Sequence, residues 1–140
     1  MKNTQAVFLA GRLNEAADDF LLAELRREGA EGLVPSHGDI LSALFREDGL
    51  PMSAIATKTH RTKSTVSALA DRLEKYGYLE RRRSSEDARV VGLYLTEKGR
   101  ALKPAFSRIS DRLSERVCAG FTSEEVRLLE KLLERALHNF

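Results

Sequence analysis

Residues 62–99, "TKSTVSALADRLEKYGYLERRRSSEDARVVGLYLTEKG", change their hydrophobic pattern half-way, and that change predicts the fold. In the first half, apolar side chains recur every three or four residues, as on one face of a helix, at Val66, Leu69, Ala70, Leu73 and Tyr76. Thr62 stands where an N-cap belongs, and Gly77 stands where a helix ends. In the second half, residues 78–83 and 90–95 suit two short strands joined by the turn "SSEDA". We therefore expect a helix followed by a β-hairpin.

The residues before this stretch predict three further helices. Apolar residues at helical spacing run from Ala6 to Leu25 and stop near "REGAEG". The segment "PSHGDILSALF" begins a second helix with Ser36 as its N-cap, and Ser53 caps a short third helix, "AIATK". A short helix, a tight turn, a longer helix and a hairpin form the order of a winged helix-turn-helix, so we call Thr62–Tyr76 the recognition helix.

Two helices are predicted after the hairpin. Thr96 caps a long helix that runs to Val117 with a kink at Pro104, and Thr122 begins a capping box, "TSEE", that opens a last helix. The fold class is therefore mainly α with a small β-hairpin. We expect a single domain, 1–140, with a winged helix-turn-helix region at 35–99 and flanking helices at 1–30 and 100–140. The first helix has more large apolar residues than one small domain can cover, which independently favours a dimer.

The composition is that of a folded protein. Of 140 residues, 42% are hydrophobic and 31% are charged, which is typical of one globular domain. The net charge is only +2, but residues 58–89 hold nine Lys/Arg against five Asp/Glu, and this local excess points to a polyanionic partner. The single cysteine, Cys118, excludes an intramolecular disulfide, and we expect an inert buried residue rather than an oxidant sensor. Because no apolar run could span a bilayer, we expect a cytoplasmic protein with no membrane partner.

The polar face of the recognition helix suits DNA. Small hydroxyl and methyl side chains crowd its N-terminal half, so the helix can approach base edges closely, and hydroxyls can bond bases or phosphates. The DNA-binding residues predicted for this helix are Thr62, Lys63, Ser64, Thr65, Ser67, Ala68 and Arg72. The alternative is an ordinary solvated face, and the helix alone does not decide between the two.

The basic hairpin favours the DNA interpretation. Arg81, Arg82 and Arg83 end the first strand beside the recognition helix, where we expect them near phosphates. Arg89, near the tip, can enter a minor groove, whose narrow A·T-rich forms attract cations. Asp87 stands two residues earlier and can hold the Arg89 guanidinium through two hydrogen bonds. A solvated basic hairpin with a chance ion pair is the alternative. The neighbouring helix-turn-helix makes that interpretation the less favoured one.

These segments resemble the MarR family of bacterial transcriptional regulators. The most specific match is "DARVVGLYLTEKG", which carries the family's wing pattern Asp-x-Arg-x-x-x-Leu-x-Leu-Thr-x-x-Gly at Asp87, Arg89, Leu93, Leu95, Thr96 and Gly99. The segment "LVPSHGDILSAL", the residues from "MSAIATK" onward and the flanking helices also resemble the family in order and spacing.

The resemblance implies a homodimer in which the first helix and the last two helices of both subunits intertwine. It also implies that the recognition helix enters the major groove of double-stranded DNA while Arg89 enters the minor groove. Family members often bind small aromatic molecules between the dimer helices and the winged domain. We therefore predict a transcriptional regulator, a repressor released by a small aromatic ligand, that binds a palindromic operator. The ligand-binding residues and the regulated genes do not follow from the sequence.

Other functions find less support in the residues. The motif "SHGD" places Ser36, His37 and Asp39 together, but the members of a catalytic triad converge from separate segments, so a helix cap is the better interpretation. The histidines lack metal-ligand spacing, and no phosphate-binding glycine loop is present. We therefore predict no enzyme activity, no catalytic residue, no metal and no cofactor. A winged-helix module that binds only protein remains an alternative, although it would have no need of the wing arginines.

Overall fold

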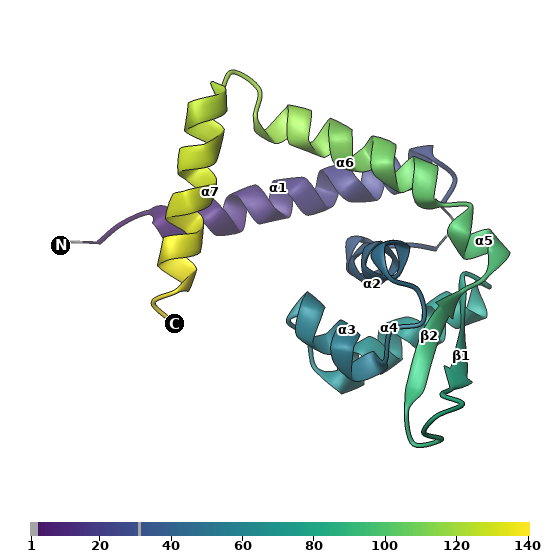
Figure 1. Cartoon of the computed structure of the whole chain (residues 1–140). Helices are drawn as coiled ribbons and strands as arrows, with labels where there is room; N and C mark the ends of the chain where they lie inside the picture. The colour runs from purple at the N-terminus through teal and green to yellow at the C-terminus, as the bar shows by residue number, and fades with distance from the viewer. Residues whose placement is uncertain (1–2, 31) are drawn as a thin grey trace.

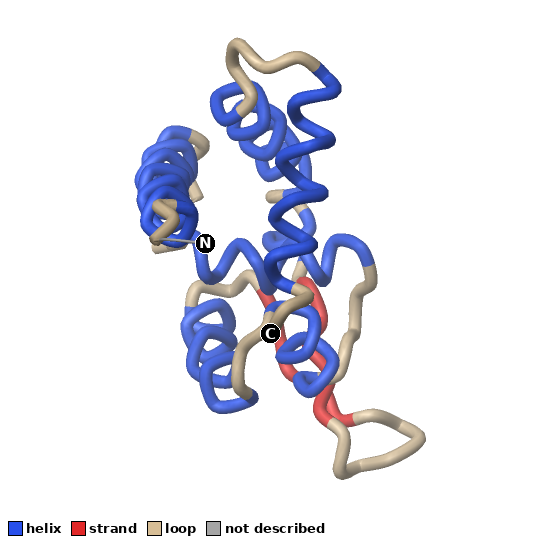
Figure 2. Tube along the Cα trace, turned by 90° about the vertical axis from the view of Figure 1, so that its left-hand side faces the viewer, coloured by secondary structure: helices blue, strands red, loops and turns tan. Residues whose placement is uncertain are grey.

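The computed structural model describes residues 3–30 and 32–140 and contains the predicted helices and hairpin (Figure 1). In chain order the elements are α1 (Ala6–Arg27), α2 (Pro35–Arg46), α3 (Met52–Thr59), α4 (Lys63–Lys75), β1 (Leu79–Arg83), β2 (Val91–Leu95), α5 (Glu97–Arg100), α6 (Lys103–Val117) and α7 (Ser123–Leu137). The strands pair antiparallel. Helices α2, α3 and α4 gather with the hairpin in one body, whereas α1 and α6 run side by side next to it (Figures 1 and 2). The predicted mainly helical fold is confirmed.

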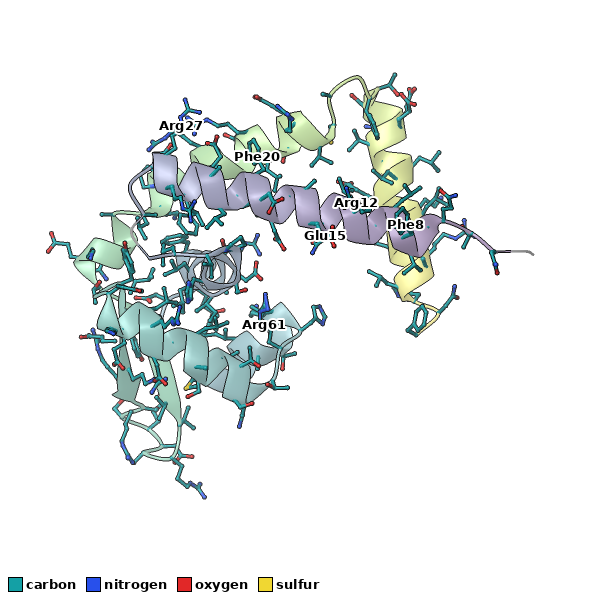
Figure 3. The ribbon with its side chains drawn as sticks, turned by 180° about the vertical axis from the view of Figure 1, so that it is seen from behind. Phe8, Arg12, Glu15, Phe20, Arg27 and Arg61 are labelled. Atoms are coloured by element: carbon teal, nitrogen blue, oxygen red, sulfur yellow. The ribbon has the colours of Figure 1, made fainter. Side chains whose placement is uncertain are left out.

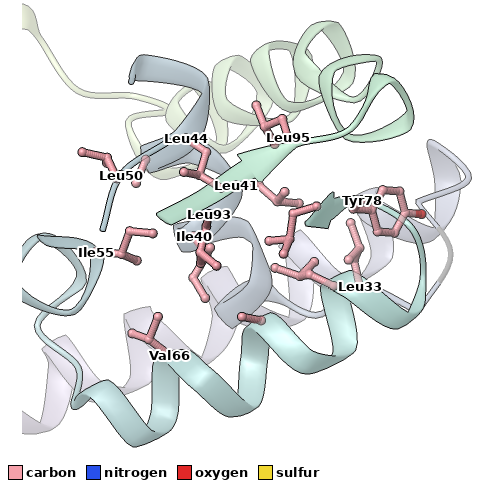
Figure 4. Close-up of a cluster of buried hydrophobic side chains, with 14 of the residues drawn as sticks. Leu33, Ile40, Leu41, Leu44, Leu50, Ile55, Val66, Tyr78, Leu93 and Leu95 are labelled. Atoms are coloured by element: carbon pink, nitrogen blue, oxygen red, sulfur yellow. The ribbon is translucent and has the colours of Figure 1, made fainter. Parts of the chain in front are cut away.

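One hydrophobic core holds the winged body together (Figure 4). Leucine and isoleucine side chains from every element of this body are less than 2% exposed, including Ile40, Leu44, Ile55, Leu79 and Leu93. Full burial of one such side chain contributes about 1.5–3 kcal/mol to folding. The core therefore fixes the recognition helix α4 relative to α2, α3 and the hairpin.

The hairpin is attached to the rest of the body through both of its strands. The register places Leu79 opposite Leu95 and Arg81 opposite Leu93, so that the leucines face the core as predicted. On the outer edge of β2, the Leu93 N–H donates to the Leu50 carbonyl oxygen at 2.9 Å, and the Leu95 N–H donates to Asp48 Oδ1 at 2.8 Å. The α2–α3 turn thus acts as a third strand beside the wing.

Helices α1 and α6 are joined by a network of ion pairs. Glu28 accepts hydrogen bonds from Arg108 (Nη2–Oε2 2.8 Å) and from Arg112 (Nη1–Oε1 3.1 Å), and Arg112 also donates to Glu24 Oε2 at 2.7 Å. The bonds from Arg108 and Arg112 lower the pKa of Glu28 from 4.5 to about 2. Glu28 is therefore ionised at neutral pH.

Three of the predicted caps are confirmed. Thr62, Thr96 and Thr122 each have a side-chain oxygen that accepts the backbone N–H three residues later. The capping box at Thr122 is complete, since Glu125 Oε1 accepts the Thr122 N–H at 2.9 Å. Gly77 has φ +82°, which is the left-handed conformation that ends a helix.

Three local predictions were wrong, and a proline stands at each of these helix starts. Helix α2 begins at Pro35 with Val34 as the N-cap, not at Ser36, and α3 is preceded by Pro51 as the N-cap, not by Ser53. Proline is favoured in the first turn of a helix, as at Pro35, because its fixed φ suits that turn and its missing N–H is not needed there. For the same reason Pro104 does not kink one long helix. It lies in the first turn of α6, separate from the short α5. Pro51 stands one position earlier relative to its helix, as the N-cap, with extended backbone.

Candidate nucleic-acid interface

Helix α4 turns its apolar side into the core and its polar side to solvent. Val66, Ala70 and Leu73 are completely buried. On the opposite side, Lys63, Ser64, Thr65, Ala68 and Arg72 are exposed, with Ser67 half-buried beside them. All of the residues predicted from the sequence for this helix therefore lie on its solvent side.

The N-terminal turn of α4 is held rigidly by hydroxyl groups. Thr62 Oγ1 accepts the Thr65 N–H at 3.2 Å and also lies 3.0 Å from Thr65 Oγ1 and 3.1 Å from Ser64 Oγ. The remaining free N–H groups of this turn and the positive end of the helix dipole point outward, an arrangement that favours an anion such as phosphate.

At the wing tip, Asp87 and Arg89 form the predicted bidentate ion pair. Arg89 Nε donates to Asp87 Oδ1 at 3.1 Å, and Nη2 donates to Oδ2 at 3.3 Å. These bonds, together with a bond from the Arg89 backbone N–H, lower the pKa of the Asp87 carboxyl below its usual range. The Arg89 side chain is nevertheless 91% exposed. A cation is thus presented to solvent in a fixed orientation.

The three consecutive arginines contact three different sets of partners, although their sequence pattern predicts the same role for all of them. Arg81 turns to α4 and bonds Ser67 and Asp71. Arg82 pairs with Glu80 of its own strand and lies 4.4 Å over the centre of the Tyr94 ring. Arg83 donates to the Ala88 carbonyl oxygen across the wing loop at 3.1 Å. Arg82 and Arg83 remain accessible on the hairpin, whereas Nη2 of Arg81 is directed at the helix.

Sequence reasoning missed the turn between α3 and α4. Arg61 Nη2 bonds Asp39 Oδ2 on α2 at 2.7 Å, and its side chain points away from the recognition helix (Figure 3). His60 ends α3 with φ +54°, a left-handed conformation that non-glycine residues seldom adopt. These two features fix the entry into α4. No local sequence signal could have found the pair, because its residues are 22 positions apart.

The comparisons with known proteins agree with this geometry. Residues 33–91 match the family model described as MarR family. The transcriptional regulator MgrA of Staphylococcus aureus, described as HTH-type, is 30% identical over 101 residues, which cover 72% of this chain and 67% of MgrA. The chain belongs to the MarR family. It is accordingly a DNA-binding transcriptional regulator and not an enzyme.

Two solved structures show how far the MarR-family fold extends along the chain. The S. aureus MepR–DNA complex superposes with a TM-score of 0.88 at 24% identity and covers 99% of this chain and 100% of MepR. PcaV from Streptomyces coelicolor, in complex with its natural ligand, gives a TM-score of 0.84 at 22% identity, and the superposition covers 99% of this chain and 97% of PcaV. At these identities the likeness shows the fold alone. It includes the flanking helices, which lie outside the family-model match.

The other constellations weighed in the sequence do not form a site. His37 is buried, with Nδ1 accepting the Val34 N–H at 3.1 Å, whereas Asp39 bonds Arg61, so the "SHGD" residues have separate partners. In residues 3–30 and 32–140, no group of His, Cys, Asp and Glu could hold a metal ion, and no helix could cross a membrane. Cys118, expected in the core, is only half-buried, as the C-cap residue of α6.

A cavity of about 260 Å³ lies where α1, α2 and α6 meet. Its walls are mostly apolar, with a few hydroxyl and carboxyl groups, and comprise Leu21, Leu25, Pro35, Gly38, Asp39, Ser42, Phe106, Ile109, Ser110 and Leu113. It lies between the flanking helices and the winged body. These residues could not be chosen from the sequence, because they come from three distant segments.

Proposed function

We propose that this MarR-family protein is a repressor that binds a palindromic operator as a homodimer and is released by a small aromatic ligand. The observation that carries the proposal is the combination of an exposed, small-residue face on α4 with a pre-oriented, 91% exposed Arg89 on the adjoining wing. A regulator of this kind works where the DNA is, which in a bacterium is the cytoplasm.

In this proposal, α4 lies in the major groove and the wing tip in the minor groove. Thr62, Lys63, Ser64, Thr65, Ser67, Ala68 and Arg72 face the DNA from the helix. Arg89, held by Asp87, enters the minor groove, and Arg82 and Arg83 lie nearer the phosphates. The fold likeness to MepR, whose structure is that of a DNA complex, supports this placement. Arg81 instead bonds Ser67 and Asp71 of α4.

The homodimer is supported by apolar side chains that this chain leaves uncovered. On α1, Val7, Phe8 and Leu9 are 82%, 66% and 57% exposed. No residue of α7 is buried, and Leu128, Leu132, Leu133 and Leu137 are 45–72% exposed. Helix α7 also turns away from the winged body (Figures 1 and 2). Exposed apolar surface of this extent marks an interaction site, and a second copy of the same helices would cover it.

The effector is supported by the cavity between α1, α2 and α6. Its largely apolar walls suit a flat aromatic ring, and Ser42, Ser110 and Asp39 offer hydrogen bonds to polar substituents. The fold likeness to PcaV, which was solved with its natural ligand, is consistent with a ligand in such a fold. A ligand that wedges these helices apart would change the spacing of the two α4 helices, so that they no longer match successive major grooves about 34 Å apart.

The experiment is a mobility shift and footprint on the DNA upstream of the protein's own gene at two salt concentrations, with and without salicylate as the first aromatic probe. We expect a two-fold symmetric footprint, binding that weakens steeply with salt, and release by the probe. In vitro transcription from the same DNA should fall when the protein is added. A single asymmetric half-site, or transcription that rises, would contradict the proposal. A complex that aromatic compounds do not change would remove the effector from it.

A further inference from the structure

We propose that Arg81 is a positioning residue for DNA recognition: it holds the wing to the recognition helix, at the angle at which α4 and Arg89 can engage DNA together. The proposal rests on the proposed DNA-binding role of α4 and the wing. It assigns Arg81 a contact within the protein in place of a contact with phosphate.

A single guanidinium nitrogen of Arg81 makes three contacts with α4. Arg81 Nη2 donates to the Ser67 carbonyl oxygen at 2.8 Å, to Ser67 Oγ at 3.3 Å and to Asp71 Oδ1 at 2.7 Å. In addition, the Arg81 backbone N–H donates to Glu74 Oε2 at 3.3 Å. Ser67, Asp71 and Glu74 follow one another at four- and three-residue steps, so they form a stripe along the helix. The strand is therefore joined to two turns of α4.

Burial separates Arg81 from the other wing arginines. Its side chain is 28% exposed, whereas that of Arg82 is 56% and that of Arg89 is 91% exposed. Its Nε is buried without a hydrogen-bond partner among the described residues. The guanidinium is thus wedged between strand and helix. Its Nη2 is committed to Ser67 and Asp71 of α4.

The two strands of the hairpin are anchored on different elements. β2 is bonded to the α2–α3 turn through the Leu50 carbonyl oxygen and Asp48. β1 reaches α4 through the polar contacts of Arg81. Two anchors at different points set the tilt of the hairpin, and Arg89 lies beyond the ends of both strands. Because each strand residue carries the chain about 3.3 Å farther, a small change of tilt at the anchors moves the tip by several ångströms.

Arg81 also compensates an unfavourable charge on the recognition helix. Asp71 is 64% exposed on α4, and an uncompensated carboxylate there would repel phosphates. The ion pair with Arg81 neutralises this charge. The effects of removing Arg81 and Asp71 should therefore be coupled, which would not be the case if Arg81 acted on the DNA by itself.

The test compares Arg81→Met with Arg82→Met. Arg82 is the matched control, because it is the next residue of the same strand and its partners, Glu80 and Tyr94, both belong to the hairpin. Operator DNA is first selected from a random pool by the wild-type protein. Affinity for this DNA and for random DNA is then measured over a salt series. The proteins compared are the two single variants, a third single variant, Asp71→Asn, and the Arg81→Met/Asp71→Asn double variant. Hydrogen exchange of the hairpin amides is measured in the free protein.

For Arg81→Met we expect operator affinity to fall at least about tenfold, the scale of one lost specific contact. In the Arg81→Met/Asp71→Asn double variant, which has no uncompensated carboxylate, the salt slope should stay that of the wild type. The ratio of operator to random affinity should fall, the hairpin amides should exchange faster, and adding Asp71→Asn should restore part of the lost affinity. Arg82→Met should instead weaken both DNAs alike and reduce the salt slope by about one.

The proposal is overturned if Arg81→Met behaves as Arg82→Met does, with equal losses on both DNAs, a smaller salt slope and effects that add to those of Asp71→Asn. If Arg81→Met does not fold, Arg81→Lys takes its place. The lysine side chain keeps the charge, but its nitrogen lies one bond closer to the backbone than Arg81 Nη2, so it should reach Ser67 and Asp71 poorly and lose operator preference partially. If the wild type selects no sequence from the pool, the proposed function fails. Separately, hydrogen exchange of the hairpin amides that is the same in Arg81→Met as in the wild type would show that Arg81 does not hold the hairpin to α4.

Discussion

Asp87 and Arg89, two residues apart at the wing tip, share three hydrogen bonds. Asp87 Oδ1 accepts from the Arg89 backbone N–H at 3.0 Å and from Nε at 3.1 Å, and Oδ2 accepts from Nη2 at 3.3 Å. An arginine this exposed would otherwise sample many rotamers, and fixing it on binding would oppose affinity. The carboxylate therefore orders the guanidinium before DNA arrives.

Removing either member of this pair should weaken operator binding to different extents. Arg89→Ala should lose about 1–3 kcal/mol of binding free energy, the scale of a specific groove contact. Asp87→Ala should lose less, because the arginine keeps its charge and loses only its orientation. Titration of operator and random DNA over a salt series checks both values. Equal, small losses on both DNAs would mean that the wing is a solvated basic hairpin.

The sequence predicted elements whose signals are local. The caps at Thr62, Thr96 and Thr122 need only a hydroxyl and a backbone N–H three residues later, and the Asp87–Arg89 pair spans two residues. The buried faces of α4 and the hairpin followed from simple periodicity. Such features can be found without knowing the fold.

Contacts between distant segments could not be predicted. From the sequence we expect Arg81 near phosphates. Its partner Asp71 lies on another element, and only the packing of the hairpin brings the two together. The pairs of Arg112 with Glu24 and Glu28 join residues 88 and 84 positions apart. The direction in which a long charged side chain points depends on its tertiary neighbours, which hydrophobic periodicity does not report.

The contribution of Glu28 to the free energy of unfolding should depend on pH. Its pKa is lowered from 4.5 to about 2 by the bonds from Arg108 and Arg112. The unfolded state therefore binds a proton first as the pH falls, so this contribution is complete above about pH 4.5 and disappears towards pH 2. Glu28→Gln should be less stable than the wild type at pH 7, and the two proteins should converge over that window. Urea unfolding at fixed protein concentration measures the difference.

The control for this experiment is Glu15→Gln. Glu15 pairs with Arg12, but both side chains are 69% exposed, so the interaction is screened by solvent. We expect no measurable change at either pH. A difference between Glu28→Gln and the wild type that stays constant from pH 7 to pH 2 would show that the loss arises from packing and not from the charge of Glu28.

Gly99 should tolerate no side chain. A Cβ built there would overlap the carbonyl oxygen of Tyr78 and lie 3.2 Å from Leu95 Cδ2, at the junction of the wing with α5. Gly99→Ala should therefore destabilise the protein by about 3 kcal/mol, the upper end of usual overpacking costs. At Gly38, inside α2, a Cβ would meet only Phe106 at an ordinary 3.6 Å. Gly38→Ala should be neutral or stabilise by up to about 1 kcal/mol. Thermal unfolding of both variants tests the contrast, and equal melting temperatures would contradict it.

The proposed dimer predicts that deletion of residues 1–25 gives aggregated or unfolded protein. The deletion removes Phe8, Leu9 and Leu13, together with Phe20 and Leu21. It also exposes the side of α6 against which α1 packs within the chain, and the apolar surface of α7 that these side chains would cover in a dimer. A well-folded monomer from this deletion would contradict the proposed interface. Light scattering and circular dichroism distinguish these outcomes.

A single charge on α7 tests the same interface without truncating the chain. Leu132 is 48% exposed in one chain, and in a two-fold symmetric dimer any change at this position acts twice. Leu132→Glu should weaken association by about 2 kcal/mol or more, the scale of an interface hot spot, and give monomers with folded winged domains. Operator affinity should fall with it, because one subunit can occupy only one half-site. Lys131→Glu is the control, since it adds negative charge at the neighbouring exposed polar position. Light scattering that finds Leu132→Glu as dimeric as Lys131→Glu would show that α7 lies outside the interface.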